Sequence, residues 1–215
     1  DSDNGGTVTP TDGSVTGDKV ASTGAFTIGA AGTASSLAGI PFYNGDTTSI
    51  YTHDVSGTDS SATDNTAFGK NALDAITSAT DNVAVGHDAG TAVTTGGFSV
   101  FVGADAGKAQ TTGNTNVGIG YQALAANVDG DRNTAVGTLA FAALDPSSNA
   151  DMENVAVGYY AGAANTTGDY NTFLGALAGT SVTTGGQNTL IGRYAGGGFD
   201  TENHNLAIGR NALGG

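Results

Sequence analysis

The chain has 215 residues, 36 of them glycine, with no cysteine or tryptophan, and 38% of the residues are hydrophobic. Only 12% are charged, 20 acidic against 6 basic, which gives a net charge of −14. Ordinary globular domains carry about 25% charged residues, so surface helices rich in Glu and Lys are not expected. The negative charge disfavours nucleic acid and anionic lipid as partners. No apolar run approaches the ~20 residues that a membrane span needs, so no membrane insertion is expected.

The N-terminal part has the same composition but no clear period. Residues 1–24 are polar, and we expect an extended arm or linker there. Residues 25–64 are predicted to form a degenerate coil, within GAFTIGAAG at 24–32, and a connector or cap. Two short strands, at 40–43 and 49–52, are expected around a tight turn in this connector.

Nine similar units follow from Asn65 to Gly215, each beginning with a pattern of the type N-T-A-V-G. The glycine at the fifth position recurs every 17 residues, with one interval of 21. These glycines are Gly69, Gly86, Gly103, Gly120, Gly137, Gly158, Gly175, Gly192 and Gly209. The period is too short for helical-pair repeats and fits one turn of a β-solenoid. The four extra residues, around Asp145–Ser148, predict a longer loop on one coil. Residues 65–215 are therefore predicted to form an all-β, parallel β-solenoid of 17-residue coils.

Positions are numbered here from the first residue of each unit. The alternation of the first five predicts a short strand whose second and fourth residues, such as Val155 and Val157, point into the coil. On this basis Val157→Asp should strongly destabilise the fold. The third-position residues Phe101, Phe173 and Leu190 would then point outward, where they are candidates for contact with another chain.

Two further columns follow from the repeat. The eighth residue is Ala in all nine units, as expected where the coil is narrow. The first residue is Asn in every unit but one, and stacked coils would align these amides in a hydrogen-bonded column. The column comprises Asn65, Asn82, Asn116, Asn133, Asn154, Asn171, Asn188 and Asn205, and Ser99 interrupts it.

A coil with so thin a core and so much glycine gains little from apolar burial. We therefore expect association between copies of this chain, as a homotrimer or an end-to-end filament. The ninth unit stops at Gly215, partway through a coil, where an open β edge also favours a partner.

The repeated N-[TV]-A-[VI]-G-x-x-A core resembles the head repeats of trimeric autotransporter adhesins and similar repeats of bacteriophage tail fibres. The resemblance covers residues 65–215. It implies a left-handed parallel β-roll, three chains around one axis, and service as an extracellular fibre or adhesin. The units here are somewhat longer than is usual in adhesin heads, and neither a membrane anchor nor a stalk heptad is present in the sequence.

Few residues suggest chemistry. Asp88 and Asp105 share the seventh position of adjacent units, so their carboxylates should lie roughly 5 Å apart, near the separation in retaining glycosidases. His87 is their neighbour. The rest of that column offers no consistent cleft, so we interpret the pair as solvated acids and predict no catalytic residue and no enzyme activity. The three histidines, His53, His87 and His204, are far apart, and we expect neither a metal nor a cofactor.

Two other columns suggest binding. Tyr121, Tyr159, Tyr160 and Tyr194 occupy the sixth and seventh positions, where exposed rings stack on sugars or pack between chains. Threonine pairs such as Thr94-Thr95 and Thr183-Thr184 recur at positions thirteen and fourteen, a pattern compatible with ice binding or with ordinary turn chemistry.

The sequence as a whole predicts a structural, non-enzymatic, extracellular fibre segment, on a virion or a cell surface, that presents or forms an attachment surface. The alternative is an adhesin head that binds a cell-surface glycan through the four tyrosines. An ice-binding solenoid is a third, less favoured, hypothesis.

Overall fold

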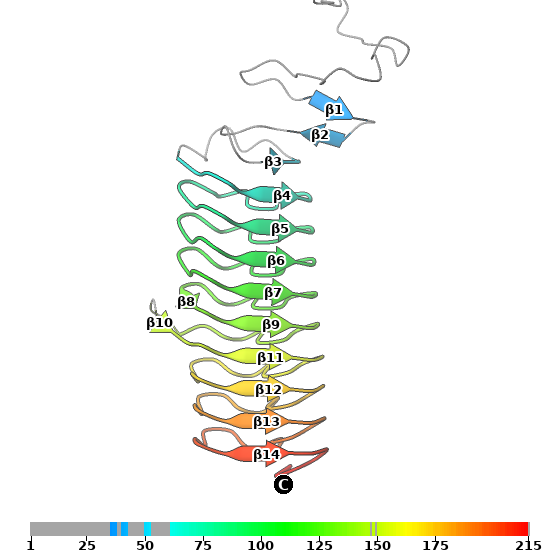
Figure 1. Cartoon of the computed structure of the whole chain (residues 1–215), viewed down its shortest axis with the longest axis vertical. Helices are drawn as coiled ribbons and strands as arrows, with labels where there is room; N and C mark the ends of the chain where they lie inside the picture. Colours follow the sequence, from blue (N-terminus) through cyan, green and yellow to red (C-terminus); the bar gives the residue numbers. More distant parts are fainter. Residues whose placement is uncertain are drawn as a thin grey trace, which may run out of the picture. The chain divides into compact units, whose positions relative to one another are not determined.

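The computed structural model describes residues 35–37, 40–42, 50–52, 61–146, 148 and 150–214. Within these ranges the chain is all-β and forms stacked coils, each of which contributes one strand to the main sheet (Figure 1). The strands of the main sheet are β3 (Ile50–Tyr51), β4 (Thr66–Phe68), β5 (Val83–Val85), β6 (Val100–Val102), β7 (Val117–Ile119), β9 (Thr134–Val136), β11 (Val155–Val157), β12 (Thr172–Leu174), β13 (Thr189–Ile191) and β14 (Leu206–Ile208). The others are β1 (Ser35–Leu37), β2 (Ile40–Phe42), β8 (Gly130–Asp131) and β10 (Ala150–Asp151).

The main sheet has ten strands, all parallel, in the order in which they follow along the chain. The register places like positions of successive units side by side, as in Val83 beside Val100 beside Val117. This confirms the predicted parallel β-solenoid and its 17-residue coil. The sheet begins earlier than Asn65, because β3 already pairs with β4.

The two strands predicted in the connector form as β2 and β3, but they do not pair with each other. β2 pairs with β1 in antiparallel fashion, whereas β3 joins the main sheet. Three predictions lie outside the described residues: the arm at 1–24, the degenerate coil at 24–32 and the turn between the two strands.

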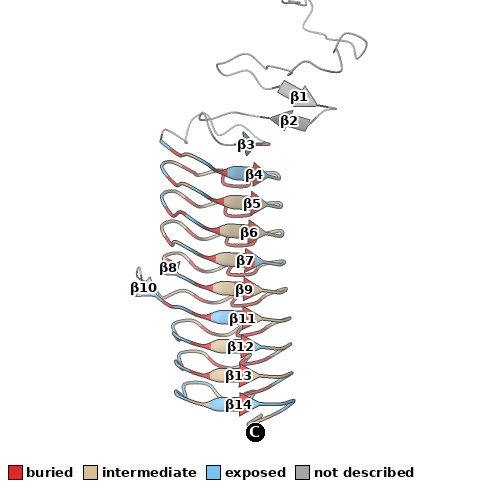
Figure 2. Ribbon diagram, viewed as in Figure 1, coloured by how far each residue is buried: buried red, intermediate tan, exposed pale blue. Residues whose placement is uncertain are grey.

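The interior of each coil is lined by positions one and three, not by positions two and four. Ala84, Phe101, Phe173 and Leu190 are fully buried at position three, while Val157 at position four is partly exposed. Figure 2 shows buried residues in the strands beside intermediate or exposed neighbours. The prediction that branched residues at positions two and four point inward is therefore wrong, and so is the outward placement of Phe101, Phe173 and Leu190.

The physical reason lies in the asparagine at position one. A side chain that must bond to the coils around it lies inside, and alternation along a strand then turns position three inward and positions two and four outward. The apolar residues on the outer face are more strongly branched than those inside. A prediction from hydrophobicity alone therefore exchanged the inward and outward positions of the strand.

The asparagine column forms as predicted. The Oδ1 atom of Asn65 accepts the backbone N–H of Asn82 at 3.0 Å, and the same contact repeats up the stack, for example from Asn188 to Asn171 at 2.9 Å. The Nδ2 atoms donate to carbonyls at position fifteen, as Asn82 does to Gly96 at 3.0 Å. The members at Asn82, Asn116, Asn133, Asn154, Asn171 and Asn188 are fully buried.

Gln110 supplies hydrogen bonds to the asparagine column at the point where Ser99 interrupts it. Its Nε2 donates to the carbonyl of Gly113 at 2.8 Å and to the Ser99 hydroxyl at 3.2 Å, while its Oε1 accepts from Asn116 at 2.8 Å. The Gly113 bond is the one that an asparagine at position 99 would make. A buried glutamine at position twelve thus supplies the amide that position one lacks.

The interior of the coils is filled by side chains at positions three and nine, whose sizes compensate for each other. A large residue at position three accompanies glycine at position nine, as in Phe173 with Gly179 and Leu190 with Gly196, and a Cβ at either glycine would meet that large side chain. In other units a small residue at position three accompanies a large one at position nine, as in Ala135 with Phe141. Where both are small, as in Ala156 with Gly162, large side chains of the neighbouring coils lie against the glycine. The alanines at position eight are buried from Ala72 to Ala195, as predicted.

Conformation favours glycine at all nine fifth positions, and lack of space also excludes a Cβ at every one of them except Gly209. Their φ angles lie between +118° and +143°, a region that side-chain-bearing residues rarely adopt. A Cβ on Gly137 would lie 2.5 Å from the carbonyl oxygen of Gly158 in the next coil. The predicted structural role of these nine glycines fits this geometry.

Candidate interaction surface

The outer face of the main sheet carries two columns of side chains, which we call the sheet face. Position four is apolar throughout: Phe68, Val85, Val102, Ile119, Val136, Val157, Leu174, Ile191 and Ile208. Position two is either a branched apolar residue or threonine: Thr66, Val83, Val100, Val117, Thr134, Val155, Thr172, Thr189 and Leu206. Neither column contains a charged residue.

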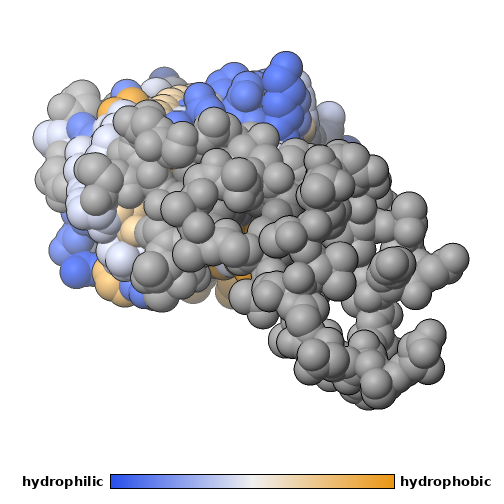
Figure 3. Space-filling model, turned by 90° about the horizontal axis from the view of Figure 1, so that it is seen from above, coloured by the Kyte–Doolittle hydropathy of each residue, from blue (hydrophilic) through white to orange (hydrophobic). Residues whose placement is uncertain are grey.

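All residues of the sheet face are at least partly exposed. Leu174 is 46% exposed, and Leu206 and Ile208 are each 65% exposed. Seen from above, hydrophobic residues reach the outer surface of the coils beside hydrophilic ones (orange and blue, Figure 3). Where one face of a sheet is open to water, that face ordinarily carries polar residues. A continuous apolar face of this kind is typical of a surface that another protein covers.

The dimensions suit such an interface. Ten strands spaced about 4.8 Å apart give a face roughly 43 Å long, and each strand with its flanking corners spans roughly 20 Å. The product, of the order of 800 Å², matches the area that each partner buries in a standard protein interface.

Corner residues flank the sheet face at both strand ends. The residue at position seventeen stands before each strand in a left-handed conformation, with φ of 58° at Phe98 and 54° at Tyr170. Phe98 is 62% exposed and Tyr170 48% exposed. The sixth residue of each unit follows the strand, and here Tyr121 is 49% and Tyr159 54% exposed. The sheet face therefore has an apolar centre flanked by exposed aromatic residues, a residue type that is enriched at protein interfaces.

The four predicted tyrosines lie along one flank but not in one environment. Tyr121, Tyr159 and Tyr194 are exposed, whereas Tyr160 is half-buried and its ring lies 4.4 Å from that of Tyr159. Phe98 and Tyr170, on the opposite flank, were missed by sequence reasoning. The repeat register did contain their signal, since both occupy position seventeen.

The acidic pair of the sequence analysis is brought together. Ligand atoms of His87, Asp88 and Asp105 lie within 4.8 Å of one another, and His87 Nδ1 is 3.1 Å from an Asp88 oxygen. Amides hold both ends of the pair: Asn71 Nδ2 donates to Asp88 at 2.8 Å and Gln122 Nε2 to Asp105 at 3.2 Å. Each carboxylate of the pair therefore has an amide hydrogen-bond donor in the coil on its other side. His204 lies on the last coil, and His53 falls outside the described residues.

The threonines of position thirteen bond to the protein itself. Thr94 Oγ1 donates to the carbonyl of Thr111 at 3.2 Å, and Thr166 does the same to Thr183 at 3.1 Å. Their hydroxyls serve the coil-to-coil ladder, which accounts for the repetition of threonine.

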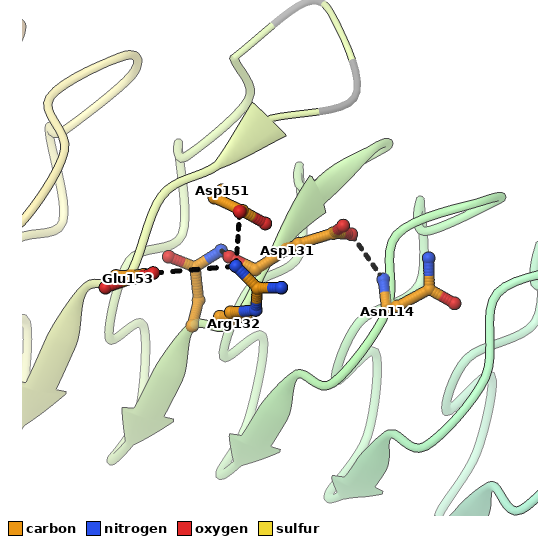
Figure 4. A network of polar contacts seen from close by, with 6 residues as sticks. Asn114, Asp131, Arg132, Asp151 and Glu153 are labelled. Atoms are coloured by element: carbon orange, nitrogen blue, oxygen red, sulfur yellow. Dashed lines mark hydrogen bonds and ion pairs between the residues drawn. The ribbon is translucent and has the colours of Figure 1, made fainter.

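An ionic network lies where β8 and β10 leave the regular coil, next to the stretch in which the longer loop was predicted (Figure 4). Residues 147 and 149 of that stretch lie outside the described residues. β8 and β10 pair in parallel, and the main sheet continues past them from β9 to β11. Arg132 contacts Asp151 and lies 3.5 Å from Glu153, while Asp131 accepts the backbone N–H of Asn114 at 2.6 Å. Arg132 therefore has two carboxylate partners within its own chain.

These features define a β-solenoid repeat protein with an exposed apolar sheet face. No match was found when the chain was compared with models of protein families, curated proteins and solved structures. The described part of the chain contains no helix long and apolar enough to cross a membrane.

Proposed function

We propose that this chain is a structural, non-enzymatic segment of an extracellular fibre, built from three copies that pack through their sheet faces and presenting or forming an attachment surface. The uncharged, apolar sheet face carries the proposal, because its burial supplies the stabilisation that the thin coil interior lacks. The resemblance of the repeat to adhesin heads and tail fibres supports the number of copies and the extracellular location.

The test is the mass of the whole chain in solution, by light scattering or native mass spectrometry. The expected result is a discrete trimer. In Val136→Lys/Val157→Lys, two charges on the sheet face should give a monomer that keeps its circular dichroism spectrum. Ser78→Lys/Thr95→Lys adds the same charge at exposed positions elsewhere on the coil and should stay trimeric. A monomeric parent chain at high concentration would contradict the proposal.

A second candidate function is glycan binding through the tyrosine-bearing flank, because Tyr121 and Tyr159 expose about half of their surface. Exposed aromatic rings bind the apolar faces of sugars. Retention on a glycan array that Tyr121→Ala/Tyr159→Ala abolishes would favour this function. A wild-type chain that is retained by no glycan would eliminate it.

A further inference from the structure

Three side chains that can bind a metal ion meet at one corner of the stack, where two successive coils lie side by side. His87 and Asp88 occupy positions six and seven of one unit, and Asp105 occupies position seven of the next. One ligand atom from each of the three lies within 4.8 Å of the other two. The described part of the chain holds no other such group of three His, Asp or Glu side chains. The sequence prediction of no metal considered the histidines alone, whereas stacking of the coils brings two carboxylates to one of them.

Residues outside this cluster hold the two carboxylates in place. The backbone N–H of Asp105 donates to the carbonyl of His87 at 2.9 Å, which joins the two coils at the cluster. Oδ1 of Asp88 accepts from Asn71 Nδ2 at 2.8 Å, and Oδ2 of Asp105 accepts from Gln122 Nε2 at 3.2 Å. These amides belong to the coils on either side of the pair. Hydrogen bonds of this kind orient the carboxylates that bind metals in proteins.

The amides leave one oxygen of each aspartate for a further partner. Oδ2 of Asp88 lies 3.1 Å from His87 Nδ1, and Oδ1 of Asp105 has no hydrogen-bond or ion-pair partner in the described part of the chain. Lys70, which stands at position six of the preceding unit, makes no ion pair with either aspartate within those residues. Two carboxylates so close together repel each other unless a positive charge lies between them. A bound cation supplies that charge.

From this geometry we propose that His87, Asp88 and Asp105 bind a divalent transition metal ion of the Zn²⁺ type, with water completing its coordination. One imidazole nitrogen and two carboxylate oxygens suit Zn²⁺, whereas Ca²⁺ and Mg²⁺ prefer oxygen ligands alone. Bonds of about 2.0–2.2 Å place two ligands of a tetrahedral ion roughly 3.4 Å apart, so the third ligand must approach by no more than roughly 1 Å. The His87 side chain is 55% exposed and has room to turn.

Such an ion joins two coils, because two of its ligands belong to one unit and the third to the next. Binding to the folded chain alone stabilises the stack beside β5 and β6. All three ligands come from a single copy, so the site exists whether or not copies associate. The inference therefore goes beyond the proposed function and does not depend on it.

Calorimetric titration of the whole chain, without an affinity tag, with Zn²⁺ tests the site. We expect one ion to bind per chain and the melting temperature to rise when Zn²⁺ is present. Asp105→Asn and His87→Gln each remove one ligand and should weaken Zn²⁺ binding by more than about 100-fold, beyond the effect of losing an outer hydrogen-bond partner. Asparagine tolerates the left-handed backbone at position 105, where φ is 58°, so this variant should fold.

Two matched controls remove the same chemical groups elsewhere. Asp81→Asn and His204→Gln change an exposed acid and an exposed histidine outside the cluster, and both should bind Zn²⁺ as the parent chain does. Loss of binding in the two ligand variants alone supports the site. Absence of Zn²⁺ binding by the parent, parent-like binding by either ligand variant, or loss in either control overturns it. Tighter binding of Ca²⁺ or Mg²⁺ than of Zn²⁺ overturns the assigned class of metal. Circular dichroism without metal verifies that each variant is folded.

Discussion

The two faces of each strand are both apolar, yet they have different roles. Phe173 is fully buried inside the coil, and its neighbour Leu174 is 46% exposed on the sheet face. The inner face is narrow, with one amide and one apolar residue per strand, whereas the outer face is flat and uniform. Folding of the single chain depends on the inner face, and the association proposed above depends on the outer one. A residue's hydrophobicity therefore does not reveal which of the two processes it serves.

The largest expected difference is between adjacent residues on opposite faces. Phe173→Ala should lower the free energy of unfolding by about 3–5 kcal/mol, because it opens a cavity between coils whose glycines cannot fill it. Leu174→Ala should change the unfolding of the isolated chain by less than about 1 kcal/mol and weaken association instead. Urea unfolding at one low protein concentration, with light scattering at high concentration, measures both effects. Equal destabilisation by the two variants would contradict the assignment of faces.

Two fifth-position glycines allow the cost of backbone conformation to be measured apart from the cost of a clash with the next coil. Gly137→Ala combines a φ of +135° with a close approach to the next coil, whereas Gly209, at +118°, has no atom within 4 Å of the added Cβ. Conformation alone costs about 1–3 kcal/mol, so Gly209→Ala should lose that amount and Gly137→Ala clearly more. Thermal unfolding of the two variants gives the comparison. Equal losses would show that conformation, not space, selects these glycines.

The inner amide column allows a test of coupling. Ser99→Asn should crowd Gln110 and cost about 1–3 kcal/mol, and Gln110→Val should break its bonds to Gly113 and Asn116. The double variant recreates the pairing of Asn82 with Val93, so it should be more stable than the sum of the single changes by about 1–2 kcal/mol. A double-mutant cycle in urea measures this coupling. Additive effects would mean that Gln110 does not replace the missing amide.

A small increase in the free energy of unfolding is expected from a substitution at Thr115, at the corner before β7. Thr115 is β-branched and exposed with a φ of 58°, a conformation that asparagine tolerates better. Thr115→Asn should raise the free energy of unfolding by about 0.5–1 kcal/mol. Thr95→Asn changes another exposed threonine that lacks positive φ and should bring no gain. The two melting temperatures, measured at low concentration, decide the matter.

The smallest expected effect is on the stability of the fold at acidic pH. Oε2 of Glu202 accepts the backbone N–H groups of Asp200 and Thr201 at 2.6 and 3.0 Å, and these bonds hold the pKa of Glu202 below its usual value. A lowered pKa in the folded chain adds stability above the unfolded pKa, and this is lost as pH falls through the folded value. Glu202→Gln should flatten the pH dependence of unfolding between pH 5 and 3 slightly. An unchanged profile would show that these bonds contribute nothing.

Much of the solenoid could be read from the sequence. The 17-residue period, the asparagine column and the alanines at position eight follow directly from the repeat, because identical residues stack on identical residues when coils stack. The glycine column was equally visible, since only glycine adopts that backbone conformation next to the neighbouring coil. The flanks of the sheet face were half visible: the tyrosines after the strands were noticed, and Phe98 and Tyr170 before them were not.

What the sequence determined by itself is therefore the coil, its length and the stacking of its columns, all of which depend on local periodicity. Tertiary structure alone decided which side of each strand faces inward. Both sides are apolar, and the hydrogen bonds that the asparagines make to the next coil and to position fifteen select the inner side. Tertiary structure also decided how the interior is filled. Phe141 and Phe173 both lie against the space above Gly162, and no single unit contains the volume that its neighbours supply.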